Sequence, residues 1–249
     1  VAGRALLDME TSMATVADDA FAAALADAGV DAAAVAYVVG TGYGRYKIAF
    51  GREQVTEISC HARGAVRLFP GTRTVLDIGG QDTKAIRVSA DGSVEDFTMN
   101  DKCAAGTGRF LGAASYALEM PLSELGPLAL QSTNPVRITT TCTVFAESEI
   151  ISHLAKGILP EDVLNGVHRS ISQRCAALAR RVGIEPEVTL TGGVSRNVAM
   201  VRLLETELGV TLNVSPEAHF CGALGAALFA IDRIREQAME PALVAGGRT

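Results

Sequence analysis

The stretch Leu76-Asp-Ile-Gly-Gly-Gln-Asp-Thr-Lys84 decides the fold of this chain. The apolar run that enters it predicts a strand over 74–78, and a second strand is predicted over 84–88 after a tight glycine turn. Gly79 and Gly80 allow this turn to press backbone N–H groups against an anion, because glycine adopts conformations that other residues avoid. The stretch therefore predicts a strand, an anion-binding turn and a second strand.

A second stretch, Met99-Asn-Asp-Lys-Cys-Ala-Ala-Gly-Thr-Gly-Arg-Phe110, continues the pattern. It places Cys103 before another glycine-rich turn, and an amphipathic helix is predicted to begin near Gly108. Cys142 has a similar setting in Thr139-Thr-Thr-Cys-Thr-Val-Phe-Ala-Glu147, directly before a predicted helix. The two cysteines indicate metal or redox ligands next to a phosphate-binding turn.

The composition is that of an ordinary globular protein, with 249 residues, 48% hydrophobic and 20% charged. The net charge of −6 and the lack of a basic block argue against a nucleic-acid partner. No apolar run reaches the length of a membrane span, and no signal peptide is recognisable. Five scattered cysteines favour a reducing cytoplasm over a disulfide framework. The chain begins with Val1 rather than Met, which suggests a fragment of a longer protein.

The rest of the chain alternates helices and strands. Helices are predicted over 12–29, with Ser12 as N-cap and Gly29 at its end, and over 55–68, 108–118, 144–156, 163–182, 198–208 and within 216–234. Strands are predicted over 34–39, 74–78, 84–88, 94–99, 135–140, 187–190 and 210–214. This alternation predicts an α/β protein with two α/β lobes around a cleft.

Three glycine turns occur in order along the chain, and together they favour a nucleotide site more than each does alone. They are Asp77-Ile-Gly-Gly80, Thr191-Gly-Gly-Val194 and Gly222-Ala-Leu-Gly-Ala-Ala227. The middle turn places glycine where a flat adenine or a ribose can lie against the backbone. The last turn is interpreted as close packing of a helix on a neighbouring element. A structural role without a ligand remains the alternative for each turn.

Three polar residues of the first turn are the candidate catalytic groups. Asp77 and Asp82 supply carboxylates of the kind that hold Mg²⁺ beside phosphates, and Gln81 is placed to orient an attacking water or serves only as a turn residue. The pattern favours nucleotide hydrolysis over simple binding. The predicted nucleotide-binding residues are Gly79, Gly80, Lys84, Gly106, Thr107, Gly108, Gly192, Gly193 and Asn197.

The cysteines fall into two groups. Cys103 and Cys142 precede predicted helices, whose positive N-termini lower the pKa of a thiol and stabilise an anionic iron–sulfur cluster. A cluster takes four thiolates, so two ligands per chain require a dimer. The alternative is that both lie in unrelated loops. Cys60 and His61 lie on one apolar helical stripe, where a packed thiol and a histidine with a satisfied N–H are favoured over metal ligation. Cys175 lies on the buried stripe of another predicted helix and is interpreted as a core residue.

Six segments together resemble the ATPases that activate 2-hydroxyacyl-CoA dehydratases and the ATPase subunits of benzoyl-CoA reductase, the BadF/BadG/BcrA/BcrD type. They are Gly40-Thr-Gly-Tyr-Gly-Arg45, Glu57-Ile-Ser-Cys-His-Ala62, the stretches 76–84 and 99–110, Thr141-Cys-Thr-Val-Phe-Ala-Glu-Ser-Glu149 and Thr191-Gly-Gly-Val194. The resemblance extends over nearly the whole chain.

The resemblance implies an actin and hexokinase type of ATPase fold, with ATP and Mg²⁺ in a cleft. It also implies a [4Fe–4S] cluster that bridges two subunits, with Cys103 and Cys142 as the ligands from each chain. The partner ATPase chain is either identical or a paralogue. An acyl-CoA dehydratase or reductase component receives the electron, and a low-potential carrier such as ferredoxin or flavodoxin supplies it.

The same resemblance sets the expected domain division. Residues 1–103 form an N-terminal lobe with the phosphate turn, and residues 104–249 form a C-terminal nucleotide-binding lobe. The family also has an Asp-x-Gly-Ser/Thr phosphate hairpin near its N-terminus, which residues 1–10 lack. We expect that hairpin to precede Val1, or else this chain departs from the family pattern.

Three classes of function remain open from the sequence. The first is an ATP-driven electron-transfer protein that serves an acyl-CoA enzyme, with a slight lean toward the benzoyl-CoA side. The second is a small-molecule kinase of the same fold, without iron. The third is a nucleotide-switched scaffold that catalyses no chemistry. Bound iron separates the first class from the others, and a phosphorylated small-molecule product identifies the kinase.

Overall fold

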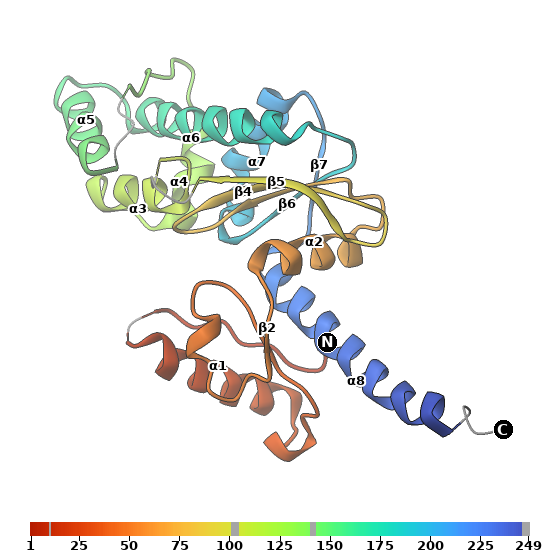
Figure 1. Cartoon of the computed structure of the whole chain (residues 1–249). Helices are drawn as coiled ribbons and strands as arrows, with labels where there is room; N and C mark the ends of the chain where they lie inside the picture. Colours follow the sequence, from red (N-terminus) through yellow and green to blue (C-terminus); the bar gives the residue numbers. More distant parts are fainter. Residues whose placement is uncertain (10, 101–104, 140–142, 246–249) are drawn as a thin grey trace. The chain divides into compact units, whose positions relative to one another are not determined.

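The computed structural model describes residues 1–9, 11–100, 105–139 and 143–245 (Figure 1). The chain groups into two compact units. The first combines residues 1–60 with 222–249, and the second holds residues 61–221. The predicted boundary between residues 103 and 104 falls inside the second unit, and as a division between functional lobes it stays a prediction.

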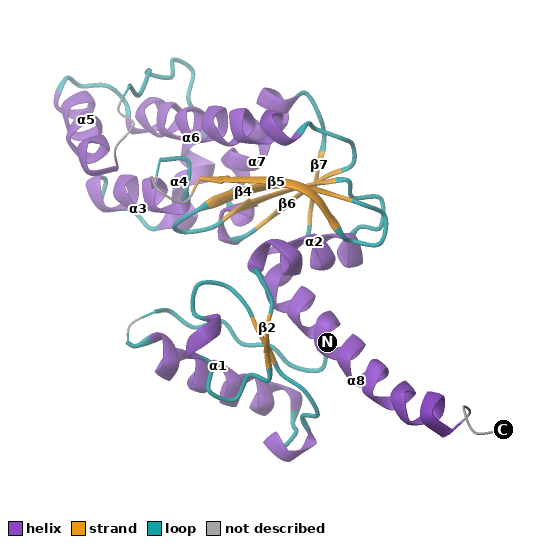
Figure 2. Cartoon of the chain, viewed as in Figure 1, coloured by secondary structure: helices purple, strands orange, loops and turns teal. Residues whose placement is uncertain are grey.

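The described part of the second unit is built on a five-stranded sheet with the order β5-β4-β3-β6-β7 (Figure 2). Its strands are β3 (Thr74–Ile78), β4 (Thr83–Val88), β5 (Val94–Asn100), β6 (Val188–Thr191) and β7 (Leu212–Val214). Strands β3, β4 and β5 form an antiparallel meander, whereas β6 runs parallel to both β3 and β7. Strand β3 lies at the centre and all five of its residues are buried. The predicted mixed α/β architecture and the meander are confirmed.

Helices lie over and beside this sheet (Figure 1). They are α3 (Gly108–Ala117), α4 (Leu122–Ala129), α5 (Thr143–Ala155), α6 (Pro160–Val182) and α7 (Val198–Leu208), with short 3-10 turns η3 (Gly193–Arg196) and η4 (Ala218–Phe220). Helix α6 runs along the sheet and contacts β3, β4 and β5 (Figure 1). Its first turn carries Glu161 and Asp162 and its last turn Arg180 and Arg181, which suits the helix dipole at both ends.

The main core of the second unit lies between the sheet and these helices. Leu76 and Ile78 of β3, Phe110 of α3 and Ile171 of α6 are fully buried in it. Each such side chain contributes about 1.5–3 kcal/mol on transfer from water. The core therefore fixes the strand ends from which the candidate catalytic residues project.

The first unit contains α1 (Met13–Ala28), η1 (Ala32–Ala34), η2 (Arg45–Lys47), most of α8 (Cys221–Ala245) and a small parallel pair, β1 (Val39–Gly40) and β2 (Glu53–Gln54). Helix α2 (Glu57–Leu68) begins there and continues into the second unit. The predicted caps of α1 are confirmed, because the Ser12 hydroxyl accepts from the Thr15 N–H at 3.2 Å and Gly29 ends the helix at φ 65°.

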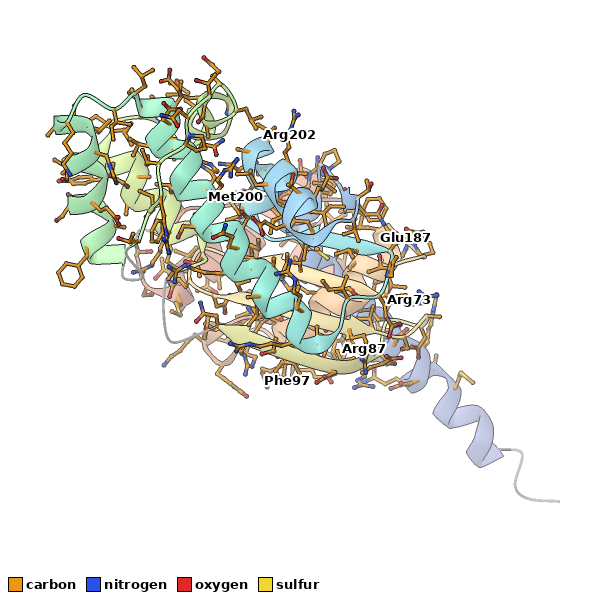
Figure 3. The ribbon with its side chains drawn as sticks, turned by 90° about the horizontal axis from the view of Figure 1, so that it is seen from above. Arg73, Arg87, Phe97, Glu187, Met200 and Arg202 are labelled. Carbon is orange, nitrogen blue, oxygen red and sulfur yellow. The ribbon has the colours of Figure 1, made fainter. Side chains whose placement is uncertain are left out.

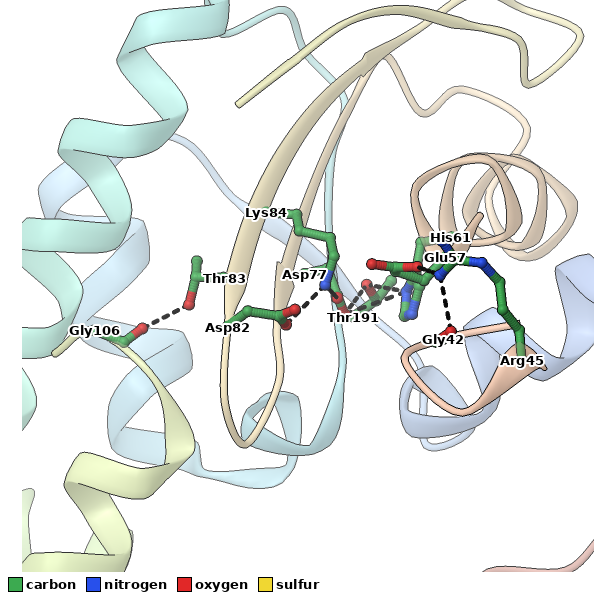
Figure 4. Close-up of polar contacts among 10 residues, drawn as sticks. All are labelled: Gly42, Arg45, Glu57, His61, Asp77, Asp82, Thr83, Lys84, Gly106 and Thr191. Carbon is green, nitrogen blue, oxygen red and sulfur yellow. Dashed lines mark hydrogen bonds and ion pairs between the residues drawn. The ribbon is translucent and has the colours of Figure 1, made fainter. Parts of the chain in front are cut away.

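Ion pairs of Arg233 and Arg45 connect elements of the first unit. Arg233 of α8 donates to both carboxylate oxygens of Glu53 at 2.8 and 2.9 Å, and this hydrogen bonding lowers the pKa of Glu53. Arg45 donates to Glu57 at 3.1 Å and to the Gly42 carbonyl at 2.9 Å (Figure 4). These contacts bind the segment between β1 and β2 to the helices beside it.

Two predicted strands are wrong. Residues 34–39 give a 3-10 turn and a strand of only two residues, Val39–Gly40. Residues 135–139 form no strand, because the Val136 N–H donates to the Asp162 carbonyl at 3.2 Å instead of to a strand partner. The residue at 140 lies outside the described residues.

One helix, α4, was not predicted. Its interior holds Gly126 and Pro127, which are poor helix formers, so the local pattern does not indicate a helix. The strand over 74–78 and the helix over 198–208 have the predicted bounds. The last predicted helix is longer than expected and ends at Ala245.

Candidate active site

Asp77 lies at the centre of a polar cluster where the ends of three strands meet (Figure 4). Its Oδ1 accepts from the Thr191 hydroxyl at 3.0 Å, and the Lys84 ammonium lies 3.7 Å from its Oδ2. Thr191 and Lys84 are the register partners of Asp77 on β6 and β4. Strand pairing alone therefore brings these three side chains together.

Lys84 pairs most closely with Asp82, whose Oδ1 lies 2.7 Å from its ammonium. All three charged side chains are buried, with Lys84 only 3% exposed. Because two carboxylates face one ammonium, the cluster carries a formal excess of one negative charge. Lys84 was predicted to bind nucleotide, and the geometry gives it a role in holding the carboxylates, so phosphate contact by Lys84 stays a prediction.

The second carboxylate oxygen of Asp82 is a buried atom without a hydrogen-bond partner among the described residues. Buried polar atoms are nearly always paired, so an unpaired carboxylate oxygen calls for a ligand, water or ion. Oxygen ligands of this type suit Mg²⁺. The donor set thus fits the cation that the sequence predicts beside phosphates.

His61 joins the same cluster from helix α2. Its Nδ1 lies 3.0 Å from the Thr191 hydroxyl and 3.2 Å from Asp77 Oδ1. The interpretation of His61 as a hydrogen-bonded histidine on a packed stripe is confirmed, but its contact with a candidate catalytic carboxylate was not foreseen. Residue 61 is 16 positions from Asp77 in sequence, and only the fold brings the two together.

The predicted anion-binding turn joins β3 to β4, with Gly80 and Gln81 exposed at its tip. It is fixed to the start of α3, because the N–H groups of Gly108 and Arg109 donate to the carbonyls of Gly79 and Gly80 at 2.8 and 2.9 Å. These two N–H groups of the first helical turn are thereby used within the protein. The glycine turn at Gly79 and Gly80 and the glycine-rich turn before α3 therefore form one connected piece of backbone.

A cavity of about 620 Å³ opens beside this piece. Its lining includes Gly80, Gly108, Gly193 and Asn197, four of the predicted nucleotide-binding residues. The volume is within the range of about 300–1,000 Å³ that small-molecule sites occupy. The other lining residues are Leu111, Leu122, Ser123, Pro127, Val194, Arg196 and Val198. Sequence reasoning missed the wall from Leu122 to Pro127 because it missed helix α4.

Gly192 is required at the end of β6. Its φ of 85° is unfavourable for other residues, and a Cβ there would meet the Ile78 carbonyl and would lie 2.7 Å from Asp77 Oδ1. The middle glycine turn therefore brings β6 against the carboxylate cluster. A Cβ added at the neighbouring Gly193 would have no atom within 4 Å, and Gly193 lines the cavity.

Asn197 is held by three hydrogen bonds at the cavity wall. Its Oδ1 accepts from the N–H groups of Ala199 and Met200 at 3.0 Å each, which caps helix α7. Its amide lies 3.0 Å from Nε2 of His168, whose Nδ1 lies 2.7 Å from the Leu164 carbonyl. Since a carbonyl only accepts, Nδ1 of His168 is the donor and Nε2 accepts from Asn197. Burial lowers the pKa of His168, which favours this neutral form.

Five of the nine predicted nucleotide-binding residues do not line this cavity, namely Gly79, Lys84, Gly106, Thr107 and Gly192. The Gly106 carbonyl accepts from the Thr83 hydroxyl at 2.6 Å, and Gly106 lines a different cavity against α6. Thr107 is fully buried and caps helix α3 by accepting from the Arg109 N–H. Their contact with nucleotide stays a prediction.

The predicted metal ligands Cys103 and Cys142 lie outside the described residues. Within the described ranges, no group of three or more His, Cys, Asp or Glu side chains is arranged to hold a metal ion. Cys60, Cys175 and Cys221 are buried free thiols, which confirms the interpretation of Cys60 and Cys175 as packed side chains. Burial raises the pKa of Cys175 to about 12. Among the described helices, none combines the length and the apolar character that crossing a bilayer requires.

Comparison with known proteins gives a consistent result. The BadF/BadG/BcrA/BcrD ATPase family matches residues 7–230. The (R)-2-hydroxyglutaryl-CoA dehydratase activating ATPase of Acidaminococcus fermentans is 50% identical over 79% of this chain and 75% of its own length. One of the benzoyl-CoA reductase subunits of Thauera aromatica is 36% identical over 86% of this chain and 78% of its own length.

A solved structure extends the likeness to the fold. The activator of the 2-hydroxyisocaproyl-CoA dehydratase from Clostridium difficile with bound ADPNP superposes with a TM-score of 0.86 and 42% identity. The match covers 90% of this chain and 83% of that one. It confirms the predicted α/β fold of the actin and hexokinase type.

Proposed function

Because this chain belongs to the BadF/BadG/BcrA/BcrD ATPase family, we propose that it couples ATP hydrolysis to electron delivery. The acceptor in this proposal is an acyl-CoA dehydratase or an aromatic acyl-CoA reductase, and the electron is delivered singly at low potential. The observation that carries the proposal is the cavity between the glycine turns, beside a buried carboxylate cluster with an unpartnered oxygen. The relative with bound ADPNP, an analogue of ATP, supports the same ligand class.

In this proposal the nucleotide lies in the cavity of about 620 Å³. Gly80 and Gly108 face the phosphates, while Gly193 and Asn197 face the ribose and base. Glycine at these positions lets the ligand approach the backbone closely. His168 holds Asn197 in place through its Nε2, so the cavity wall is formed before the nucleotide binds.

Asp82 and Asp77 hold the Mg²⁺ that accompanies ATP. The unpartnered Oδ2 of Asp82 is the atom available for this role. The cation supplies charge neutralisation at the phosphates when it is bound. Gln81 at the exposed tip of the turn orients the attacking water, and the Lys84 ammonium, which lies 2.7 Å from Asp82 and 3.7 Å from Asp77, holds both carboxylates in place.

Cys103 and Cys142 are the cluster ligands in this proposal, two from each of two subunits, around one [4Fe–4S] cluster. The second subunit is an identical chain or a paralogue, and the protein acts in the cytoplasm. The support is their placement in sequence before helices α3 and α5 and the burial of the other three thiols. The cluster supplies one-electron chemistry when it is bound.

The test is the iron and sulfide content of the protein purified without oxygen. We expect about two irons and two sulfides per chain, since four of each are shared between two chains. Cys103→Ala and Cys142→Ala each remove the iron and the visible absorption. Cys175→Ala, which alters a buried thiol of the same chain, retains both.

Two results would contradict the proposal. One is wild-type protein that contains no iron but hydrolyses ATP. That result would favour the kinase or the scaffold class instead. The other is a Cys103→Ala protein with its full iron content.

A further inference from the structure

Helix α6 carries a groove that the proposed ATP site does not use. Two cavities of about 540 and 300 Å³ adjoin along this helix and share Arg174 and Ala177 in their linings. Their linings also contain Arg137, Arg169 and Arg181. We call the surface formed by Arg137, Arg169, Arg174 and Arg181 the basic groove. Figure 3 views α6 from above, with its side chains drawn over the sheet.

One wall of the basic groove is held firmly against α6. A Cβ at Gly166 would meet the Val136 carbonyl, so only glycine permits this close approach. Asp162 fixes the same segment by accepting from the Ser132 hydroxyl at 2.7 Å and from the Asn134 N–H at 2.9 Å. The hydrogen bond from Ser132 lowers the pKa of Asp162, which keeps this anchor ionised. The groove is therefore a built feature and not a gap between loose segments.

The charge of the groove is opposite to that of the whole chain. Among the described residues, its lining holds four arginines and no acidic side chain, although the chain has a net charge of −6. Two carboxylates reach its rim, since Glu149 accepts from Thr139 at 2.8 Å and Glu207 lies 3.4 Å from the Gln173 amide. Arginine is the side chain best suited to pair with carboxylates on a partner. A positive patch of this kind attracts negatively charged partners.

The length of the groove favours a macromolecule over a small anion. Arg169 and Arg181 are 12 positions apart on α6 (181 − 169), which is about 18 Å at a rise of about 1.5 Å per residue. Both are exposed, and Arg174 between them is half-buried. One phosphate or carboxylate contacts only a small part of such a row, whereas an acidic protein surface contacts all of it.

The position of the groove in the chain connects it to the redox ligands of the proposed function. Asn100 and Ala105 belong to its lining and border the segment 101–104, which contains Cys103. Thr139 also belongs to its lining and borders 140–142, which contains Cys142. Both proposed cluster ligands are thus within three residues of the groove in sequence.

We propose that the basic groove is the docking surface for a small acidic electron-carrier protein. The reduced carrier gives one electron to this protein and is itself oxidised by one electron, so no proton or further reactant is required. This inference rests on the proposed function, because it assigns the entry side of that electron-transfer step. Electrostatic attraction then sets mainly the rate of encounter between the two proteins.

The test uses the whole protein and oxidised flavodoxin, an acidic flavin protein, as the probe. Association is measured at about 20 mM and about 300 mM salt, because salt screens surface charges. Arg169→Glu and Arg181→Glu together are expected to lower the association rate constant by about tenfold or more at low salt. The loss shrinks at high salt, while ATP hydrolysis and iron content remain those of the wild type.

Arg202→Glu is the matched control. Arg202 is an exposed arginine of α7 that lines neither cavity (Figure 3). The same change of charge at Arg202 is expected to alter flavodoxin association by less than about twofold, because Arg202 lies outside the groove lining and a charge outside the contact contributes little once salt screens it.

Three outcomes overturn the docking surface. The first is equal association by wild type and the Arg169→Glu/Arg181→Glu variant at low salt. The second is a change in oligomeric mass in that variant, which makes the groove an interface between subunits. The third is a variant that binds flavodoxin as the wild type does but delivers electrons more slowly to the acyl-CoA enzyme. That result makes the groove a docking surface for the electron acceptor. Wild-type protein without iron refutes the proposed function instead, whatever the variants do.

Discussion

Replacement of Lys84 by Met tests whether the buried carboxylates depend on this one ammonium. In the wild type, the ammonium lies 2.7 Å from Asp82 and 3.7 Å from Asp77, and its side chain is 3% exposed. Lys84→Met keeps most of the apolar volume and removes the charge. Asp77 and Asp82 then remain close together, buried and without a cation.

The expected loss of stability in Lys84→Met follows from the burial of this ion pair. Removal of one partner of a buried ion pair costs about 3–5 kcal/mol, because the remaining charge is left uncompensated. Arg87 on the same strand provides the control, since it is 32% exposed, pairs with Glu95 at 3.1 Å and donates to the Val182 carbonyl at 3.2 Å. An exposed pair of this kind contributes about 0.2–1 kcal/mol. We therefore expect Lys84→Met to lower the free energy of unfolding several times more than Arg87→Met does.

The assay is urea unfolding in the presence of EDTA, followed by circular dichroism. With an m value of about 2–3 kcal/mol/M, the midpoint of Lys84→Met falls by about 1–2 M urea. The double variant Lys84→Met/Asp82→Asn recovers part of this loss, because one uncompensated charge is gone. A loss below about 1 kcal/mol in Lys84→Met, or no recovery in the double variant, would refute the reasoning.

The remaining predictions concern protonation and turnover. Burial lowers the pKa of His168 in the folded protein. As the pH drops below about 6.5, the unfolded protein therefore protonates this histidine more readily than the folded protein does, and the stability of the wild type falls. Between about pH 7.5 and 5.5, the free energy of unfolding measured with denaturant is expected to change less with pH in His168→Gln than in the wild type. An equal pH dependence in both proteins would contradict this. Asp77→Asn is expected to lower the turnover number for ATP by about 100-fold or more, whereas Asp91→Asn in the β4–β5 turn leaves it unchanged. Gln81→Ala is expected to slow turnover at saturating ATP by about tenfold with little change in ADPNP affinity, and the reverse result makes Gln81 a binding residue.

Local patterns were sufficient where the sequence carries its own boundary signals. The apolar run over 74–78 ends at paired glycines, and the helix over 198–208 begins at the capping residue Asn197 and ends at Gly209. The strand predicted over 135–140 failed because its apolar residues pack on helix α6 beside Gly166, a contact that local periodicity does not contain.

Much of the candidate site was also predictable, since its glycines and carboxylates stand next to each other in one turn. The contact between His61 and Asp77 and the neutral role of His168 were not. Both histidines lie on helices whose pattern indicates only a packed face, and their partners come from other elements. The basic groove was missed for the same reason, because Arg137 approaches the arginines of α6 only in the folded chain.

The pairing of β3 with β6 has a consequence during synthesis of the chain. Thr74 pairs with Val188, and these residues are 114 positions apart (188 − 74). The meander of β3, β4 and β5 can form early, but one edge of β3 lacks its partner until the ribosome has added β6. That edge belongs to a strand whose apolar side chains are fully buried in the finished fold. Unpaired edges of this kind promote aggregation, so the nascent chain is most vulnerable between residues 100 and 188.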